Sequence, residues 1–151
     1  MDNSRWTRDR VNMEMAKLIA HRSTCNRAQV GCVITLDGRV VSTGYGGAPS
    51  GMDHCTEVGC LLGPDGGCIR TSHAEAGAIA FAARKGVALE GATLYTTLSP
   101  CLFCAKDIIN SGVIEVIYNV AYRDPSGISL LRQAGIKVSQ YEGGDVDNVQ
   151  Y

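Results

Sequence analysis

The chain has 151 residues, of which 45% are hydrophobic and 19% charged, and its formal net charge is -1 at pH 7. This length allows one domain with a single sizeable core, which we place at residues 1–151. The slightly acidic balance argues against a general nucleic-acid binder, and no apolar run reaches the ~18–20 residues that span a membrane. Residues 1–10 are charged and lack an apolar signal core. We therefore expect a cytoplasmic protein that binds neither nucleic acid nor membrane.

The first part of the chain predicts a helix followed by a hairpin. Four apolar residues recur at helical spacing: Val11, Met15, Leu18 and Ile19. This pattern predicts a helix over residues 7–22 with these side chains on its apolar face. Two β-rich runs, 30–35 and 39–42, flank Asp37-Gly38, which is a strong signal for an antiparallel hairpin.

The rest of the chain alternates predicted helices and strands after one long irregular stretch. Residues 44–71 are rich in Gly, Pro and Cys, and loops of that length are usually functional or stapled. A second helix starts at Thr71 or Ser72, either of which can act as N-cap, and stops before Gly86. Ser99 caps a third helix that has Pro100 in its first turn and runs to Ser111. The remaining expected elements are strands at 93–97, 113–118 and 136–140 and a short helix at 128–134.

This alternation implies parallel strands joined by crossovers in the second half of the chain, next to the antiparallel hairpin of the first half. The expected fold class is therefore α/β. A mixed five-stranded sheet is flanked by helices on both faces, which gives three layers.

One pattern of residues carries the chemistry. His73-Ala74-Glu75 and Pro100-Cys101-Leu102-Phe103-Cys104, each at a predicted helix start, match the H-x-E…P-C-x-x-C signature of zinc nucleobase deaminases. One imidazole and two thiolates leave the fourth tetrahedral position of zinc open for water, whose pKa the metal lowers toward ~7. We expect His73, Cys101 and Cys104 to bind a catalytic zinc ion. We expect Glu75 to take the proton of the water and deliver it to the ring nitrogen and the departing amine.

Less specific explanations exist for each part of this pattern. A lone His is more often a satisfied surface or core residue, and a lone C-x-x-C is more often a redox or structural-zinc pair. A joint match at all four positions is improbable by chance. The combination therefore favours the catalytic site.

A second cluster of cysteines is expected from the remaining thiols. Cys25, Cys55, Cys60 and Cys68 suit a closed structural zinc site, and three of them lie in the long irregular stretch. His54 is an alternative ligand, and buried free cysteines are the alternative to a metal site. Cys32 lies within an apolar strand, where we expect a small core residue.

The chain resembles the deoxycytidylate (dCMP) deaminases of the cytidine deaminase superfamily over about residues 22–122. The resemblance rests on segments 23–31, 42–51, 54–57, 68–75 and 93–101. It implies the cytidine-deaminase-like fold and the hydrolytic deamination of dCMP to dUMP, which supplies dTMP synthesis. It also implies a second zinc in some relatives, a homohexamer, and regulation by dCTP and dTTP with Mg²⁺.

The resemblance also assigns substrate contacts. The Ser99 backbone is expected at the departing amine, and Tyr122 near the sugar and base. Arg27 is expected at the phosphate, because a guanidinium binds phosphate in a forked geometry; a surface ion pair is the equally supported alternative. Gly46 and Ala74 are expected to line the same site.

Two residues depart from the family pattern. Gly46 stands where relatives have Asn in Gly-Tyr-Asn-Gly, and Gly77 stands where they often have Asn two residues after the catalytic Glu. Either these are neutral changes, or they alter substrate range or weaken nucleotide regulation.

Four other functions compete with dCMP deamination. Another nucleotide, such as dCTP, a 5-substituted dCMP or a purine nucleotide, would use the same site. A tRNA adenosine deaminase would need a basic binding surface, and free cytidine deaminases usually have Cys in place of His73. A non-catalytic zinc-stabilised binding subunit would have no reason to keep Glu75.

Overall fold

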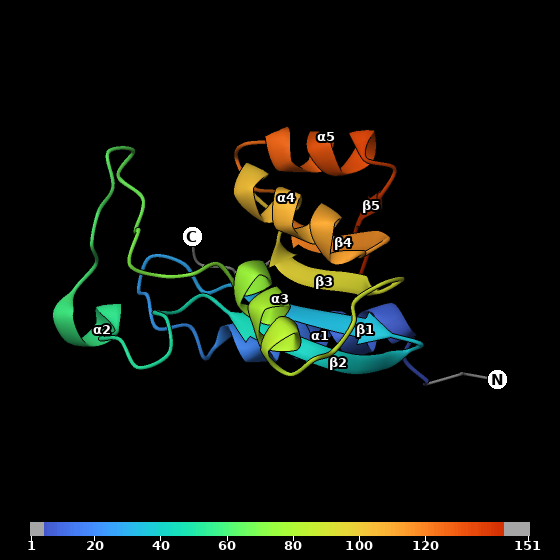
Figure 1. Cartoon of the computed structure of the whole chain (residues 1–151), viewed down its shortest axis with the longest axis horizontal. Coiled ribbons are helices and arrows are strands. Elements are labelled where there is room, and N and C mark those ends of the chain that lie inside the picture. Colours follow the sequence, from blue (N-terminus) through green and yellow to red (C-terminus); the bar gives the residue numbers. More distant parts are fainter. Residues whose placement is uncertain (1–4, 144–151) are drawn as a thin grey trace.

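The computed structural model describes residues 5–143, so the parts of the expected domain at 1–4 and 144–151 lie outside the described residues. Within this described part, ten elements follow one another along the chain (Figure 1). They are α1 (Arg8–Ala20), β1 (Gly31–Leu36), β2 (Arg39–Tyr45), α2 (Cys55–Val58), α3 (Ala74–Arg84), β3 (Thr93–Leu98), α4 (Leu102–Ser111), β4 (Glu115–Val120), α5 (Ser126–Gln133) and β5 (Lys137–Gln140).

The strands form one mixed five-stranded sheet in the order β2-β1-β3-β4-β5. Strand β1 pairs antiparallel with both β2 and β3, whereas β3, β4 and β5 are parallel. The expected antiparallel hairpin and the parallel second half are both confirmed. Strand β3 lies at the centre of the sheet, where β1 is its antiparallel neighbour and β4 is its parallel neighbour.

Helices cover both faces of this sheet, so the three-layer α/β expectation is confirmed (Figure 1). Alanines of α3, together with residues of α4 and α5, pack with Ile34 and Leu94 on one face. Met13 and Ala16 of α1 pack with Val33 and Tyr95 on the other. Because both faces are covered, β1 is buried almost continuously rather than at every second residue. Within residues 5–143 no helix is long and apolar enough to cross a membrane.

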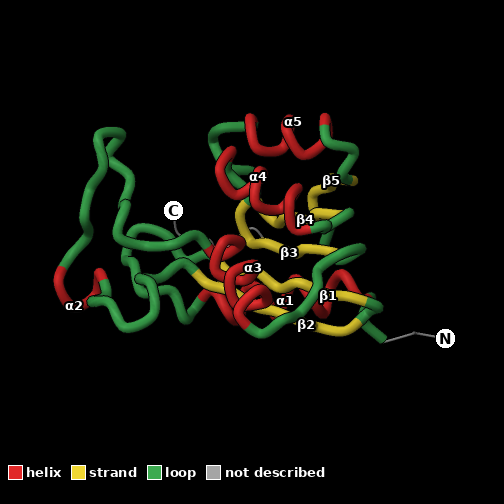
Figure 2. The backbone as a smooth tube through the Cα atoms, viewed as in Figure 1, coloured by secondary structure: helices red, strands yellow, loops and turns green. Residues whose placement is uncertain are grey.

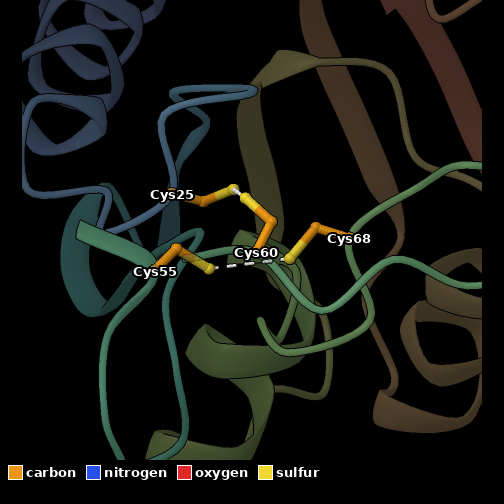
Figure 3. A group of neighbouring side chains, drawn as sticks. All are labelled: Cys25, Cys55, Cys60 and Cys68. Carbon is orange, nitrogen blue, oxygen red and sulfur yellow. Dashed lines mark hydrogen bonds between the residues drawn. The ribbon is translucent and has the colours of Figure 1, made fainter. Parts of the chain in front are cut away.

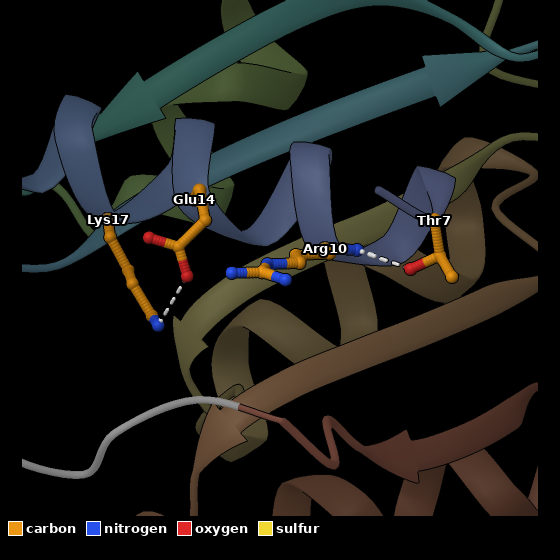
Figure 4. A network of polar contacts seen from close by, with 4 residues as sticks. All are labelled: Thr7, Arg10, Glu14 and Lys17. Atoms are coloured by element: carbon orange, nitrogen blue, oxygen red, sulfur yellow. Dashed lines mark hydrogen bonds and ion pairs between the residues drawn. The ribbon is translucent and has the colours of Figure 1, made fainter. Parts of the chain in front are cut away.

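The buried face of helix α1 matches the predicted one only in part, since Met15 and Ile19 pack against the core but Val11 and Leu18 do not. Thr7 is the N-cap, and its side chain accepts a hydrogen bond from the Arg10 N–H (Figure 4). Two of the four predicted core residues, Val11 and Leu18, are 41% and 71% exposed. The buried stripe is instead rich in small residues: Asn12, Met13, Ala16 and Ala20.

A close backbone contact explains this choice of face. A Cβ atom at Gly31 of β1 would lie 2.0 Å from the Ala16 carbonyl oxygen. At Gly31 the helix therefore lies nearly against the strand, and only a residue without a Cβ atom fits beside Ala16 and Ala20. On the outer side of the helix, Lys17 forms an ion pair with Glu14 at 2.8 Å (Figure 4).

Two predicted helix starts are also wrong. The N-cap of α3 is His73 rather than Thr71 or Ser72, and the N-cap of α4 is Cys101 rather than Ser99. Pro100 consequently precedes the helix instead of standing in its first turn. In both helices the expected metal ligand itself takes the extended capping conformation.

Residues 46–72, which we call the arm, connect β2 to α3 and project away from the sheet (Figure 2). The arm is mostly loop, but it contains the short helix α2, which the sequence did not predict. Its two ends are joined by backbone hydrogen bonds between Gly47 and Ser72, at 3.2 and 2.9 Å. This closure fixes the chain immediately before His73.

We expect Gly44→Ala to lower the free energy of unfolding by about 1–3 kcal/mol, because the added Cβ must displace α3 from β2. That Cβ would lie 2.1 Å from the Ala74 carbonyl oxygen and 2.7 Å from the Ala78 nitrogen. Gly77→Ala is the matched control within α3, where the nearest atom to an added Cβ is 4.0 Å away. It should raise stability by about 0.5–1 kcal/mol. Urea unfolding of both variants measures the difference, and equal stabilities would contradict the close approach.

Candidate active site

His73, Cys101 and Cys104 lie together at the meeting point of two helix N-termini. The His73 Nδ1 atom is 3.4 Å from the Sγ atoms of both cysteines. A tetrahedral zinc ion with Zn–S near 2.3 Å and Zn–N near 2.0–2.1 Å sets such atoms about 3.6 Å apart. The three ligand atoms therefore fit one zinc ion, and they form one of two groups of this kind in the described part of the chain.

The electrostatics of the group favour one thiolate, that of Cys101. Hydrogen bonds with the Cys104 thiol and then with His73 lower the pKa of Cys101 to about 4. Contact with Cys101 in turn raises the pKa values of Cys104 and His73. Helix N-termini carry partial positive charge, which also stabilises an anionic sulfur. The cap position of Cys101 therefore provides an ionised sulfur where a cation can bind.

Glu75 lies in the first turn of α3, two residues after His73, and is only 4% exposed. Burial raises the pKa of its carboxyl group. The Thr96 hydroxyl lies 3.3 Å from the Oε1 atom of Glu75. A buried carboxyl group beside the ligand atoms is suited to general acid–base chemistry, in which it accepts and releases a proton.

Cys32 belongs to the core beneath this carboxylate. It is fully buried and packs with the alanines of α3. Burial raises the pKa of its thiol, and the nearby Glu75 raises it further. The expectation of a small core residue at this position is confirmed.

Ser99 and Tyr122 are brought together beside the cysteine pair. The Ser99 hydroxyl accepts a hydrogen bond of 2.7 Å from the Tyr122 N–H, and the Ser99 N–H donates to the Val120 carbonyl. The sequence did not predict this bond, which attaches the segment after β4 to the chain just before Cys101. Gly127 lies close as well, since an added Cβ there would be 2.0 Å from the Pro100 carbonyl oxygen.

The other three predicted substrate contacts lie in different surroundings. Ala74 is fully buried in the first turn of α3. Gly46 is held between the Val30 carbonyl and the Thr24 N–H, both at 3.0 Å. Arg27 is exposed in the connection between α1 and β1. Their roles toward a substrate stay predictions.

The four predicted cysteines of the second cluster do gather, with Cys25 of the α1–β1 connection beside three cysteines of the arm (Figure 3). The sulfur atoms of Cys25 and Cys60 are 3.6 Å apart, as are those of Cys55 and Cys68. Sulfur ligands of a tetrahedral zinc ion lie about 3.8 Å apart, so the set fits a closed site. His54 is not part of this group.

The thiols of this cluster differ in acidity. Burial raises the pKa of Cys55 to about 12, with the hydrogen bond to Cys68 adding to the effect. Burial also opposes ionisation of Cys68, but hydrogen bonds from the Arg70 backbone, from Cys55 and from the Leu61 backbone outweigh it and lower the pKa of Cys68 to about 6. The Cys68 thiol therefore ionises more readily than the Cys55 thiol.

A separate hollow of about 360 Å³ lies between the arm, β2 and the outer side of α3. This volume is within the range of small-molecule sites. Its lining combines aromatic, small and basic side chains, among them Tyr45, Gly77, Phe81 and Arg84.

The sequence of this chain matches a family model and several known proteins. The family model described as "Cytidine and deoxycytidylate deaminase zinc-binding region" matches residues 7–120. The deoxycytidylate deaminase of Enterobacteria phage T4 is 36% identical, covering 83% of this chain and 86% of the phage protein. The enzyme of that name from Saccharomyces cerevisiae is 39% identical over 88% of this chain, which spans 44% of the yeast protein.

A solved structure agrees with these matches. The dCMP deaminase of cyanophage S-TIM5 in complex with dCMP and dUMP is 34% identical, with a TM-score of 0.79. The match covers 87% of this chain and 95% of the phage chain.

Proposed function

Because this chain belongs to the cytidine and deoxycytidylate deaminase family, we propose that it hydrolyses dCMP to dUMP and ammonia. The observation that carries this proposal is the buried Glu75 carboxylate beside the His73, Cys101 and Cys104 ligand atoms. The cyanophage relative that binds dCMP and dUMP supports the choice of nucleotide. The dUMP formed would supply dTMP synthesis.

The mechanism assigns the proton transfers to Glu75. Zinc held by His73, Cys101 and Cys104 supplies the Lewis acidity that makes water nucleophilic near neutral pH. Glu75 accepts the proton that the water loses and gives it to the N3 atom of the cytosine ring. The oxygen of the water bonds to C4, and the proton that remains on this oxygen passes through the same carboxylate to the exocyclic amine. The C4–N bond then breaks, ammonia leaves, and C4 keeps the oxygen atom.

Substrate positioning is proposed for the residues around this group. The Ser99 backbone would contact the departing amine, and Tyr122, held by the Ser99 hydroxyl, would lie along the sugar and base. Ala74 and Gly46 would line the site near the nucleotide. Exposed Arg27 would bind the phosphate through its forked guanidinium.

We also propose a second, structural zinc ion bound by Cys25, Cys55, Cys60 and Cys68. The sulfur spacing and the closed set of four thiols support it. Because three of these cysteines belong to the arm and Cys25 belongs to the connection after α1, the ion would fasten the arm to the body of the protein.

Regulation and assembly are proposed as follows. The hollow lined by Arg84, Phe81 and Tyr45 would accept dCTP or dTTP with Mg²⁺, since a basic side chain suits phosphates and aromatic rings suit bases. Five large apolar residues of the arm are 49–62% exposed: Met52, Val58, Leu61, Leu62 and Ile69. Such exposure supports a homo-oligomer, proposed here as a hexamer, in which they are covered. The free thiols of residues 5–143 suit the reducing cytoplasm.

The decisive assay is ammonia release from dCMP by the zinc-loaded protein, with and without dCTP and dTTP at Mg²⁺. We expect dCMP to be deaminated, with activation by dCTP and inhibition by dTTP. A parallel panel of dCTP, cytidine, 5-methyl-dCMP, a purine nucleotide and tRNA tests the competing substrates. Activity on dCMP without any effector response would link Gly46 and Gly77 to weakened regulation. A preference for another member of the panel would overturn the proposed substrate. Sedimentation of the same preparation measures the oligomer.

A further inference from the structure

Thr96 is the residue whose side chain forms a hydrogen bond with the Glu75 carboxylate. Neither of the two ion pairs among residues 5–143 involves Glu75. In the same part of the chain, the one hydrogen bond from another side chain to this carboxylate comes from the Thr96 hydroxyl, at 3.3 Å. Thr96 itself is fully buried. A carboxylate that has left water and forms no ion pair with a described side chain depends for its orientation on its few hydrogen bonds, here those from the Thr96 hydroxyl and from its own backbone N–H.

The position of Thr96 follows from the alternation of side chains along β3. Tyr95 and Thr97 point to the α1 side, where Tyr95 joins the core and the Thr97 hydroxyl accepts a hydrogen bond from the Gly31 N–H. Thr96 therefore points to the α3 side, toward Glu75. It is paired with Cys32 on β1 and Tyr118 on β4, so the strand is held from both sides. A β-branched side chain in such surroundings has little rotational freedom.

The hydroxyl has two acceptors within reach but a single proton. The Leu98 carbonyl oxygen lies 2.9 Å from the Thr96 Oγ1 atom, closer than the Glu75 oxygen. A hydroxyl group has one proton to donate and two lone pairs that accept. It can donate to the ionised Glu75 carboxylate. When Glu75 carries the proton taken from water on its other oxygen atom, the Thr96 hydroxyl can still donate to Oε1, so that proton stays free to pass to the cytosine ring.

We infer that Thr96 is a positioning residue that holds the Glu75 carboxylate in one orientation through both stages of its proton transfer. The inference rests on the proposed deamination. It adds that the Thr96 hydroxyl sets the orientation of the Glu75 carboxylate. Leu98 comes just before Ser99 and Cys101, so the same hydroxyl connects Glu75 to the strand end that leads to the ligand cysteines. Without it, the carboxylate would be free to rotate away from the water it must deprotonate.

The test compares Thr96→Val, which keeps the shape and loses the hydroxyl, with Thr96→Ser, which keeps the hydroxyl. We expect Thr96→Val to lower kcat for dCMP by about 10- to 100-fold. The KM, the zinc content and the calorimetric affinity for dUMP should stay within about 2-fold, because binding does not need the proton transfer. Thr96→Ser should restore kcat to within about 3-fold of the unaltered protein.

The neighbouring residue supplies the matched control. Thr97→Val also removes a buried hydroxyl from β3, but that hydroxyl bonds to the Gly31 N–H on the opposite face. It should lower thermal stability and leave kcat unchanged. In single-turnover assays, adding Thr96→Val to the Glu75→Gln variant should lower the rate by less than about 2-fold. The hydroxyl acts through the Glu75 carboxylate, so its removal has little effect once that carboxylate is gone.

Several results would overturn the inference. They are an unchanged kcat in Thr96→Val, an equal loss in Thr97→Val, or an additive loss in the double variant. Should Thr96→Val not fold, Thr96→Ser and Thr96→Ala make the same comparison, and equal kcat values in that pair would count against the hydroxyl. If the unaltered protein does not deaminate dCMP, the proposed function fails together with the inference. If it does and the hydroxyl proves irrelevant, the inference fails alone.

Discussion

Glu75→Gln is expected to lower the rate of dCMP deamination by about 10²–10⁴-fold while the protein keeps its zinc, because a neutral amide cannot take the proton of water. Glutamine has nearly the same shape and can still accept the hydrogen bond of the Thr96 hydroxyl. The folded structure and the bound metal should therefore be preserved. Ammonia release measures the rate, and atomic absorption measures the zinc content.

The control for this change is Glu90→Gln, which alters an exposed carboxylate away from the site. It should leave both the rate and the zinc content as they are. Full activity in Glu75→Gln would remove the acid–base role from this residue. A loss of zinc in Glu75→Gln would show instead that the carboxylate supports the metal group.

Cys101→Ser and Cys55→Ser are expected to remove different metal ions. Each should reduce the zinc content from about two ions per chain to about one, since each breaks one of the two ligand sets. Cys101→Ser should abolish dCMP deamination and leave the arm folded. Cys55→Ser should release the arm, which limited proteolysis detects, and lower stability by several kcal/mol, on the order of a structural zinc contribution. Zinc content, activity and proteolysis are measured on the same samples.

Cys32→Ala separates loss of a ligand from loss of a buried thiol. Cys32 is fully buried but belongs to neither cysteine group, so this variant should keep both ions. A zinc content near one ion in the unaltered protein would contradict the second site. An identical proteolysis pattern in Cys55→Ser would show that the four cysteines do not fasten the arm.

The parts of the fold that could be predicted are those set by local spacing. Asp37-Gly38 forms the turn of the β1–β2 hairpin, and Asp37 has the left-handed backbone conformation with φ 52° that this turn requires. The alternation of apolar strands and helices led to the mixed sheet. The pattern of His and Cys residues led to both groups of candidate metal ligands, because ligand chemistry restricts which residue types can gather. None of these inferences needs the distance between two elements.

The wrong predictions concern features that depend on such distances. Periodicity favoured Val11 and Leu18 as core residues of α1, but the backbone contact at Gly31 selects the alanine side. Cap propensity favoured Thr71 or Ser72 for α3 and Ser99 for α4, but His73 and Cys101 occupy the cap positions. The bond from Thr96 to Glu75 joins residues 21 positions apart. Its one signal in the sequence is a threonine at an inward-facing position of an apolar strand.

The location of the four-cysteine group has a consequence for the order in which the protein is made. Cys25, Cys55, Cys60 and Cys68 all precede α3, as do α1, β1 and β2, to which the arm is attached. His73, Cys101 and Cys104 are complete only after the central strand β3 and the start of α4 have followed. During synthesis on the ribosome, all four cysteines of this group therefore leave the exit tunnel before Cys101, so the two groups of candidate metal ligands emerge one after the other.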